Sequence, residues 1–364
     1  MSEPLKPGST IGILGSGQLG RMLALAAAEL GFRVHIYAPE KTSPASEVAH
    51  ASTCGDYDDA AALAAFADTV DVVTYEFENV PGETARILSD HTIVRPGPRA
   101  LAVSQDRLEE KNFLVKCGIA VAPFAQVDTL DDLTTALEKL GTPAILKTRR
   151  LGYDGKGQVK IDHPSEAAAA LKAIANAPAI LEGFVPFEKE ASVIVARTQE
   201  GDVAAYDVGE NDHRNHILHT TTVPADIPQS LADEAKQIAI KLAHGLEYVG
   251  VMGVEFFILP KSASGARLSV NEFAPRVHNS GHWTSDACAI SQFEQHIRAV
   301  CDWPLGDPNR HSDAVMTNLI GEDVHQWNKH AVTPNRALHL YGKREARPGR
   351  KMGHVTDLTF LKRS

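Results

Sequence analysis

The sequence predicts an α/β fold in which a Rossmann-like N-terminal domain is followed by α+β regions. Three observations support this prediction. Residues 10–37 follow a β-α-β pattern with a glycine-rich turn, and a loop rich in glycine and cations follows an apolar strand at residues 147–158. Residues 250–273 form two apolar segments around a polar turn, a pattern that indicates a β-hairpin.

The first β-α-β unit has predicted strands at residues 10–14 and 32–37, with an alanine-rich helix that ends near Leu30. The turn between strand and helix, Gly15-Ser16-Gly17-Gln18-Leu19-Gly20, has the spacing of dinucleotide sites. Such a site needs an acidic residue directly after the second strand, but Tyr-Ala-Pro stands there and Glu40 comes later. The turn therefore either binds no dinucleotide or holds a simple phosphate at the helix N-terminus.

Two glutamates follow the next predicted strand. A helix at residues 58–67 leads to a strand at 70–75, and Glu76 and Glu78 come directly after it. Ligands bind at the carboxyl ends of strands in such sheets, and residues two apart in a strand face the same way. One carboxylate could face a ligand, or both could be solvated. The Arg-Pro-Gly-Pro segment at 95–98 ends this domain.

The next region begins with a predicted helix at residues 101–117, in which Arg107 and Lys111 share one face. Such a face is usually solvated. A small α/β unit follows, with helices at 130–140 and 165–175, the latter capped by Ser165, and strands at 144–147, 158–161 and 179–182. Residues 182–185 are expected to link this unit to a second lobe.

The loop between the strands at 144–147 and 158–161 is the most distinctive segment. It contains glycines at 152, 155 and 157, and the cations Lys147, Arg149, Arg150 and Lys156. Glycine lets the backbone approach a ligand closely, and N–H groups together with cations suit a polyphosphate. The spacing does not match the P-loop. The alternative is a hairpin turn with a solvated basic rim.

The second lobe is predicted to contain strands at residues 190–196 and 203–208 and a helix at 228–245. His213, His216 and His219 are each three residues apart, so in a strand His216 would face away from the other two, and we expect no zinc site. Pairing the strands of the hairpin about the turn at 260–267 places Glu255 opposite Glu272, with Cβ atoms roughly 5 Å apart. Two opposed carboxylates repel each other unless a cation neutralises them, so this pair favours a bound Mg²⁺. The alternative is that the strands pair in a shifted register and both glutamates are exposed.

A polar segment follows the hairpin at once. Residues 274–283 read Ala-Pro-Arg-Val-His-Asn-Ser-Gly-His-Trp, which makes them a candidate anion site. A helix is predicted at 286–300 and a strand at 314–320. The tail holds a basic cluster that is either solvated or an ordered phosphate-binding surface, formed by Lys343, Arg344, Arg347, Arg350 and Lys351.

Composition excludes several classes of protein. The 364 residues are 43% hydrophobic, enough for two or three domains with real cores. A net charge of −10 argues against nucleic acid as the main partner. No apolar run is long enough to span a membrane, and the N-terminus has no secretory apolar region. The four cysteines form no CxxC pair, so we expect free thiols in a reducing cytoplasm.

These motifs resemble the ATP-grasp superfamily and, more closely, the N5-carboxyaminoimidazole ribonucleotide synthetase family of purine biosynthesis. The resemblance covers essentially the whole chain and is most specific at residues 271–283. It implies an ATP-grasp fold in four parts: a Rossmann-like pre-ATP-grasp domain at 1–100, a small lobe with a glycine-rich lid at 101–183, a large lobe with the metal hairpin at 184–310, and a small C-terminal subdomain at 311–364. A cytoplasmic homodimer is also implied.

The implied reaction carboxylates 5-aminoimidazole ribonucleotide with ATP and bicarbonate through carboxyphosphate. The resemblance assigns the ATP site to Arg107, Lys147, Gly152, Tyr153, Asp154, Gly155, Lys156, Gly157, Gln158, Glu182, Gly183, Phe184, Val185, Glu190, His213, Asn271 and Glu272. Mg²⁺ would bind Glu255 and Glu272. The ribonucleotide would meet Glu76, Tyr153, Asp154, Lys156, Lys343 and Arg350. The catalytic group would comprise Tyr153, Asp154, Arg276, His278 and Asn279. Lys156 keeps the charge of an arginine but not its bidentate geometry.

Three other functions remain open at this point. One is an ATP-grasp ligase for another acid, such as a formate-using ribonucleotide transformylase. Another is an NAD-binding oxidoreductase built on the turn at residues 15–20. The third is a nucleotide-binding protein without catalysis, which the costly opposed glutamates disfavour.

Overall fold

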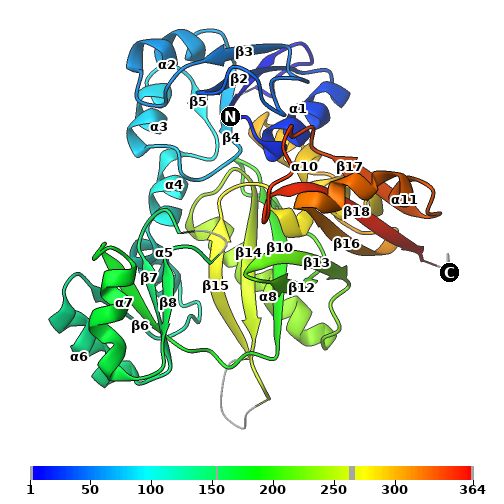
Figure 1. Ribbon diagram of the computed structural model, residues 1–364. Coiled ribbons are helices and arrows are strands. Elements are labelled where there is room, and N and C mark those ends of the chain that lie inside the picture. Colours follow the sequence, from blue (N-terminus) through cyan, green and yellow to red (C-terminus); the bar gives the residue numbers. More distant parts are fainter. Residues whose placement is uncertain (1–2, 153–154, 262–266, 362–364) are drawn as a thin grey trace.

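Three β-sheets organise the chain in the computed structural model, which describes residues 3–152, 155–261 and 267–361 (Figure 1). The first sheet is parallel, in the order β3-β2-β1-β4-β5, and belongs to the N-terminal domain. Its strands are β1 (Thr10–Leu14), β2 (Arg33–Ala38), β3 (Ala51–Cys54), β4 (Val72–Tyr75) and β5 (Ile93–Val94). Its helices are α1 (Gln18–Glu29), α2 (Ala60–Ala67), α3 (Gly82–Ser89) and α4 (Pro98–Ser104).

The second sheet is antiparallel and forms the small lobe, in the order β6-β9-β7-β8. Its strands are β6 (Phe124–Val127), β7 (Ala144–Thr148), β8 (Gln158–Ile161) and β9 (Ala179–Gly183). The helices α5 (Arg107–Lys116), α6 (Leu130–Leu140) and α7 (Ala167–Ala173) accompany it (Figure 1). The predicted cap at Ser165 is wrong, because a 3₁₀ turn at Pro164–Glu166 precedes α7 and Glu166 is its N-cap.

The third sheet has nine strands, in the order β15-β14-β10-β12-β13-β16-β18-β17 with β11 beside β10. The strands are β10 (Lys189–Arg197), β11 (Val203–Ala205), β12 (Gly209–Arg214), β13 (Ile217–Val223), β14 (Gly250–Ile258), β15 (Leu268–Ala274), β16 (Ser312–Ile320), β17 (Arg336–Leu340) and β18 (Lys351–Phe360). Its helices are α8 (Gln229–Gly245), α9 (Thr284–Ala287), α10 (Gln292–Val300) and α11 (Trp327–Ala331). The C-terminal strands thus extend the sheet of the large lobe. The four-part division of the chain stays a prediction.

Two predicted helices are each broken in two. The helix expected at 101–117 is interrupted at Asp106, whose extended backbone and carboxylate cap α5 by accepting a hydrogen bond from the Leu108 N–H. The helix expected at 286–300 is interrupted before α10, where the Ser291 hydroxyl accepts a hydrogen bond from the Glu294 N–H. Side chains that bond the backbone locally end helices in this way.

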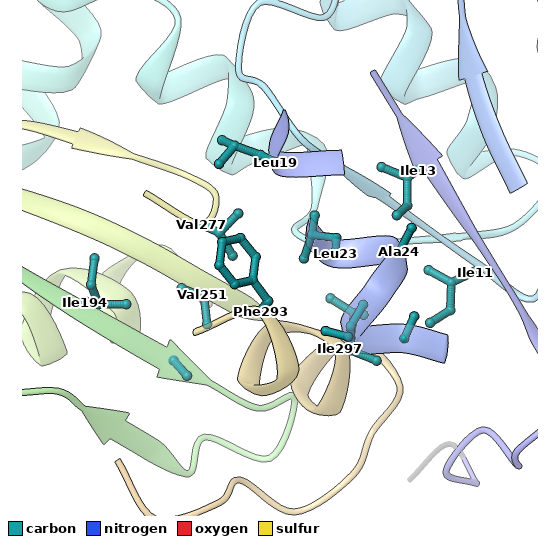
Figure 2. Packing of buried hydrophobic residues seen from close by; sticks show 14 of the residues in the cluster. Ile11, Ile13, Leu19, Leu23, Ala24, Ile194, Val251, Val277, Phe293 and Ile297 are labelled. Carbon is teal, nitrogen blue, oxygen red and sulfur yellow. The ribbon is translucent and has the colours of Figure 1, made fainter. Parts of the chain in front are cut away.

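The N-terminal domain and the large lobe share one hydrophobic core (Figure 2). Leu23 of α1 and Ile11 of β1 lie on one side of α10, and Val251 of β14 lies on the other. Phe293 and Ile297 of α10 fill the space between them and are at most 2% exposed. Because one packed cluster spans both regions, the carboxyl ends of β4 and the hairpin β14–β15 are held at a fixed separation.

Candidate active site

A cavity of about 920 Å³ lies where the N-terminal domain and both lobes meet. Nearly all predicted site residues line it. They are Glu76, Arg107, Lys147, Gly152, Gly155, Lys156, Gln158, Glu182, Gly183, Phe184, Val185, Glu190, His213, Glu255, Asn271, Glu272, Arg276, His278 and Asn279. Tyr153 and Asp154 lie outside the described residues. Gly157 packs beside Thr148 rather than on the cavity wall, and Lys343 and Arg350 line a second cavity.

The hairpin β14–β15 carries the predicted metal ligands. Glu255 pairs with Glu272 across the two strands, which confirms the predicted register at this pair. A β-bulge follows directly, since Phe256 pairs with Val270 and leaves Asn271 as the extra residue. Neighbouring residues of a regular strand point to opposite faces, but the bulge lets both Asn271 and Glu272 line the cavity.

The oxygens of this hairpin fit a hard cation. The Asn271 side-chain oxygen is buried and accepts no hydrogen bond from the described residues. Burial and the neighbouring Glu272 charge raise the pKa of Glu255. Burial opposes ionisation of Glu272 as well, but the Arg107 guanidinium, 2.8 Å away, lowers its pKa. Two carboxylates and an orphan amide oxygen are the donor set that Mg²⁺ prefers.

Cations of the small lobe meet a buried carboxylate. Glu182 is 3% exposed, and its oxygens lie 2.7 Å from Lys147 Nζ and 3.4 Å from Lys111 Nζ. Burial opposes ionisation of Glu182, but these two ammonium groups lower its pKa to about 2. Lys111 is 1% exposed and donates a hydrogen bond to the Asn271 carbonyl, so the solvated face expected for it is wrong. It joins α5, β9 and the hairpin β14–β15.

The described part of the glycine loop is held over the cavity by its own backbone. Gly155 and Gly157 have φ of 77° and 73°, a left-handed conformation that glycine adopts without strain. The Gly157 carbonyl accepts a hydrogen bond from the Thr148 N–H at 2.8 Å. A Cβ at Gly155 would lie 2.8 Å from His216, so the loop closely approaches the β12–β13 turn.

The three spaced histidines separate in the structure. His213, in β12, bonds Glu190 of β10 at 2.9 Å and lines the cavity. Burial lowers the pKa of His213, but the hydrogen bond and charge of Glu190 and the nearby Glu255 charge outweigh it and raise the pKa overall. His216 has a positive φ and lies in the turn after β12, and His219 lies in β13. His213 thus has a carboxylate partner at the cavity wall.

Glu76 occupies the glycine turn of the N-terminal domain. Its two oxygens accept hydrogen bonds from the Gly17 N–H at 2.5 Å and the Gly20 N–H at 2.9 Å. A Cβ at Gly15, whose φ is 99°, would lie 2.4 Å from the Glu76 side chain. The N–H groups that would hold a dinucleotide phosphate are therefore taken by a carboxylate of the protein itself, which agrees with the lack of an acidic residue directly after β2.

Three residues outside the predicted site list support the site: Glu78, which the sequence offered as a possible ligand-facing carboxylate, Glu110, which it did not indicate, and Lys111, which was expected to be solvated. Glu78 binds Arg276 through two hydrogen bonds, one of them at 3.0 Å from Nη2. Glu110, 2% exposed, accepts a hydrogen bond from the Phe273 N–H at 2.7 Å, and burial together with the Glu272 charge raises its pKa to about 8. Lys111 is the third. Each pairing joins segments far apart in the chain, so no local pattern indicated it.

The second cavity, of about 240 Å³, lies between the N-terminal domain and the C-terminal strands. Its walls carry hydroxyls and cations: Thr42, Ser43, Lys343, Arg344, Arg347 and Arg350, with Pro44, Glu47, Gly342 and Glu345. Burial and the Arg350 charge lower the pKa of Lys343 to about 8. The basic tail is therefore an ordered, concave surface in which Lys343 and Arg350 are partly buried, whereas Arg344 and Arg347 are exposed.

Among the described residues, no helix is both long enough and apolar enough to cross a bilayer. The four cysteines are free thiols, as the sequence predicts.

Comparisons with known proteins agree with this architecture. Family models match residues 8–105 as a ribonucleotide synthetase pre-ATP-grasp domain, 112–293 as an ATP-grasp domain, and 314–359 as a phosphoribosylaminoimidazole carboxylase C-terminal domain. An N5-carboxyaminoimidazole ribonucleotide synthase of Brucella melitensis is 56% identical over 356 residues, 97% of each chain. A Bacillus subtilis enzyme of the same name is 41% identical over 351 residues, 96% of this chain and 91% of that one.

Solved structures give the same result. A crystal structure of an N5-carboxyaminoimidazole ribonucleotide synthetase with ADP has a TM-score of 0.93 at 45% identity and covers 99% of this chain and 94% of that one. An Aspergillus clavatus N5-carboxyaminoimidazole synthase with ADP and 5-aminoimidazole ribonucleotide has a TM-score of 0.90 at 30% identity, over 97% and 94% of the chains. The predicted ATP-grasp fold is therefore confirmed, and the chain is an ATP-dependent ligase that belongs to the N5-carboxyaminoimidazole ribonucleotide synthase family.

Proposed function

We propose that this protein carboxylates the amine of 5-aminoimidazole ribonucleotide, with ATP and bicarbonate as co-substrates, in purine biosynthesis. A bicarbonate oxygen attacks the γ-phosphorus of ATP, and ADP leaves as carboxyphosphate forms. The amine nitrogen then forms a bond to the carboxyl carbon, or to CO₂ released from carboxyphosphate, while inorganic phosphate departs and the amine loses a proton. The observation that carries this proposal is one cavity bounded by the metal hairpin, the cation-rich glycine loop and Glu76.

ATP would lie between the two lobes. Arg107 and Lys147 would bind its phosphates, under a lid formed by Gly152, Tyr153, Asp154, Gly155, Lys156, Gly157 and Gln158. The adenine would meet residues 182–185. The Glu182 carboxylate there is paired with lysines, and the Gly183 and Phe184 N–H groups donate to the Pro123 and Pro143 carbonyls. Glu190 and His213 would lie beside the ribose. A closed lid would protect carboxyphosphate from water.

Mg²⁺ would be held by Glu255, Glu272 and the Asn271 amide oxygen, and it would supply charge neutralisation for the β- and γ-phosphates. Arg107 now bonds Glu272, and Lys147 now bonds Glu182. When MgATP binds, Arg107 and Lys147 would leave these carboxylates and bind the phosphates of ATP. Mg²⁺ would replace Arg107 as the partner of Glu272. Glu182 would keep Lys111 as its partner and Glu272 would gain the metal ion, which keeps the electrostatic cost of binding low.

The ribonucleotide would span the two cavities. Its 5′-phosphate fits the hydroxyls and cations around Lys343 and Arg350, and its amine would reach the main cavity beside Glu76, Tyr153, Asp154 and Lys156. Arg276, His278 and Asn279 would position carboxyphosphate, with Glu78 fixing the guanidinium. Burial and the Arg276 charge lower the pKa of His278 to about 3, so its imidazole is neutral. It would therefore bind carboxyphosphate through a hydrogen bond and not as a cation.

We also propose a cytoplasmic homodimer.

The test is release of ADP by the purified protein with MgATP and bicarbonate, with and without the ribonucleotide. We expect strong stimulation by the ribonucleotide, consumption of one ribonucleotide per ADP, and no release when Mg²⁺ is omitted. Replacing bicarbonate with formate should abolish the stimulation. If the ribonucleotide still stimulates ADP release with formate, the transformylase alternative is favoured. ADP release that ignores the ribonucleotide would keep the ATP-grasp fold but overturn the substrate.

A further inference from the structure

One buried imidazole bonds to two strands that belong to different domains. His296, in α10, is fully buried. Its Nδ1 accepts a hydrogen bond from the Val251 N–H of β14 at 3.0 Å. Because Nδ1 is the acceptor, the proton resides on Nε2, which donates to the Thr74 hydroxyl of β4 at 2.7 Å. Both ring nitrogens are therefore satisfied, and the tautomer is determined by the backbone.

The two bridged strands carry the two halves of the proposed reaction. Thr74 lies two residues before Glu76, beside which the amine would bind. Val251 lies four residues before Glu255, which belongs to the proposed metal site. The bridge is far from solvent, because Thr74 and Val251 are also fully buried. Gly250 has a φ of 127° and its added Cβ would lie 3.0 Å from the ring, so the backbone approaches His296 as closely as glycine permits.

Packing alone does not account for this histidine. Its neighbours on α10 in the core are Phe293, Ile297 and Val300, and an aliphatic side chain would fill the same space. Burying an imidazole costs free energy unless both nitrogens are hydrogen-bonded. His296 instead fixes the position of β4 relative to β14, because its two hydrogen bonds extend from opposite sides of a rigid ring. Burial also lowers its pKa to about 3, so the ring stays neutral.

We propose that His296 is a positioning residue that aligns the amine-binding end of β4 with the metal-bearing strand β14, so that the amine meets carboxyphosphate before water does. This inference rests on the proposed function. It concerns the second half of the reaction, because pairing with β10 and β15 holds β14 independently of the bridge. Loosening β4 should therefore spare ATP cleavage and impair capture of the carboxyl group.

The test compares Thr74→Val, which removes the hydroxyl at nearly constant volume, with Thr74→Ser, which keeps it. For Thr74→Val we expect the KM for the ribonucleotide to rise about five- to tenfold, as for one lost hydrogen bond. The KM for ATP should stay unchanged, and the ADP released per ribonucleotide consumed should rise above one. Thr74→Ser should retain the wild-type values. His296→Gln, whose amide can still reach Thr74, provides a second variant with an intermediate effect.

Trp303→Phe is the matched control, because it deletes another hydrogen bond between the same regions, from the indole N–H to the Leu5 carbonyl at 2.7 Å. It should lower thermal stability but leave one ADP per ribonucleotide. If Thr74→Val and His296→Gln behave like Trp303→Phe, the bridge is only structural and the inference is overturned. If the wild-type protein ignores the ribonucleotide, the proposed function itself fails, which is a separate result.

Discussion

At the scale of single residues, the cleft neutralises its own charges. Glu272 pairs with Arg107, Glu182 with Lys147, and Glu78 with Arg276. The sequence could identify most of these side chains, because a metal ligand or a phosphate cation is recognisable by type and position. It could not identify their partners, since each pair joins residues far apart in the chain.

Lys343 provides a test at this scale. Its pKa, lowered by burial and by Arg350 to about 8, means that the ammonium is charged below that pH and becomes neutral as the pH rises through it. A charged lysine attracts the substrate phosphate and a neutral one does not. We therefore expect the KM for the ribonucleotide to rise between about pH 7 and about pH 9.5, as titration of such a lysine requires. Steady-state kinetics across this range measure the effect.

Lys343→Arg is the control, because arginine stays charged throughout this range. Its KM should be nearly independent of pH, even if it differs from the wild-type value at neutral pH. Parallel pH profiles for the two proteins would show that Lys343 does not bind the phosphate.

At the scale of elements, the sequence predicted the positions of regular strands and helices but not the places where they are interrupted. The strands β1, β7 and β8, the helix α6 and the Glu255–Glu272 pair lie where the sequence predicts them. The bulge at Asn271 and the helix break at Asp106 escaped prediction. Both depend on distant partners: Lys111 Nζ holds the Asn271 carbonyl, and the Asp106 carboxylate binds Arg149 as well as the helix N-terminus. Tertiary contacts thus overrode the local periodicity.

The glycine turn gives a test at the scale of an element. A Cβ at Gly17 would lie 2.7 Å from the Glu76 carboxylate, so Gly17→Ala should displace Glu76 from its N–H partners. We expect a loss of about 1–3 kcal/mol in unfolding free energy, as for an unsatisfied buried acceptor, together with a raised KM for the ribonucleotide. Thermal unfolding and kinetics measure the two effects.

Gly82→Ala is the matched control, since no atom lies within 4 Å of its added Cβ at the start of α3. That variant should be neutral or slightly more stable. If Gly17→Ala is equally harmless, Glu76 does not occupy the turn in the way described.

At the scale of the whole molecule, the position of the cleft follows from one core. The sequence predicts a Rossmann-like domain and two lobes, yet no pattern in it showed that α10 would pack against both α1 and β14 (Figure 2). Nor did it show that β16, β17 and β18 continue the sheet of the large lobe. Such associations depend on shape complementarity between apolar faces. The sequence shows that each face is apolar but not which faces fit together.

The shared core predicts joint unfolding. Phe293→Ala should cost about 3–5 kcal/mol, as for other buried aromatic truncations. The N-terminal domain and the large lobe should then lose stability together. Hydrogen exchange of β1 and β14 amides should accelerate in parallel. Leu25→Ala, at a position 46% exposed on α1, should change little. Faster exchange in β14 with unchanged β1 would show that the two regions fold independently.

We propose that the cleft joins bicarbonate to the γ-phosphoryl group before the amine is carboxylated. The most direct test uses bicarbonate labelled with heavy oxygen, in a rapid single turnover with MgATP and the ribonucleotide, followed by mass analysis of the inorganic phosphate. We expect one labelled oxygen in each phosphate released, because the bridging oxygen of carboxyphosphate departs with phosphorus. Phosphate free of label would mean that water or another nucleophile cleaves ATP, and would rule out carboxyphosphate as the intermediate.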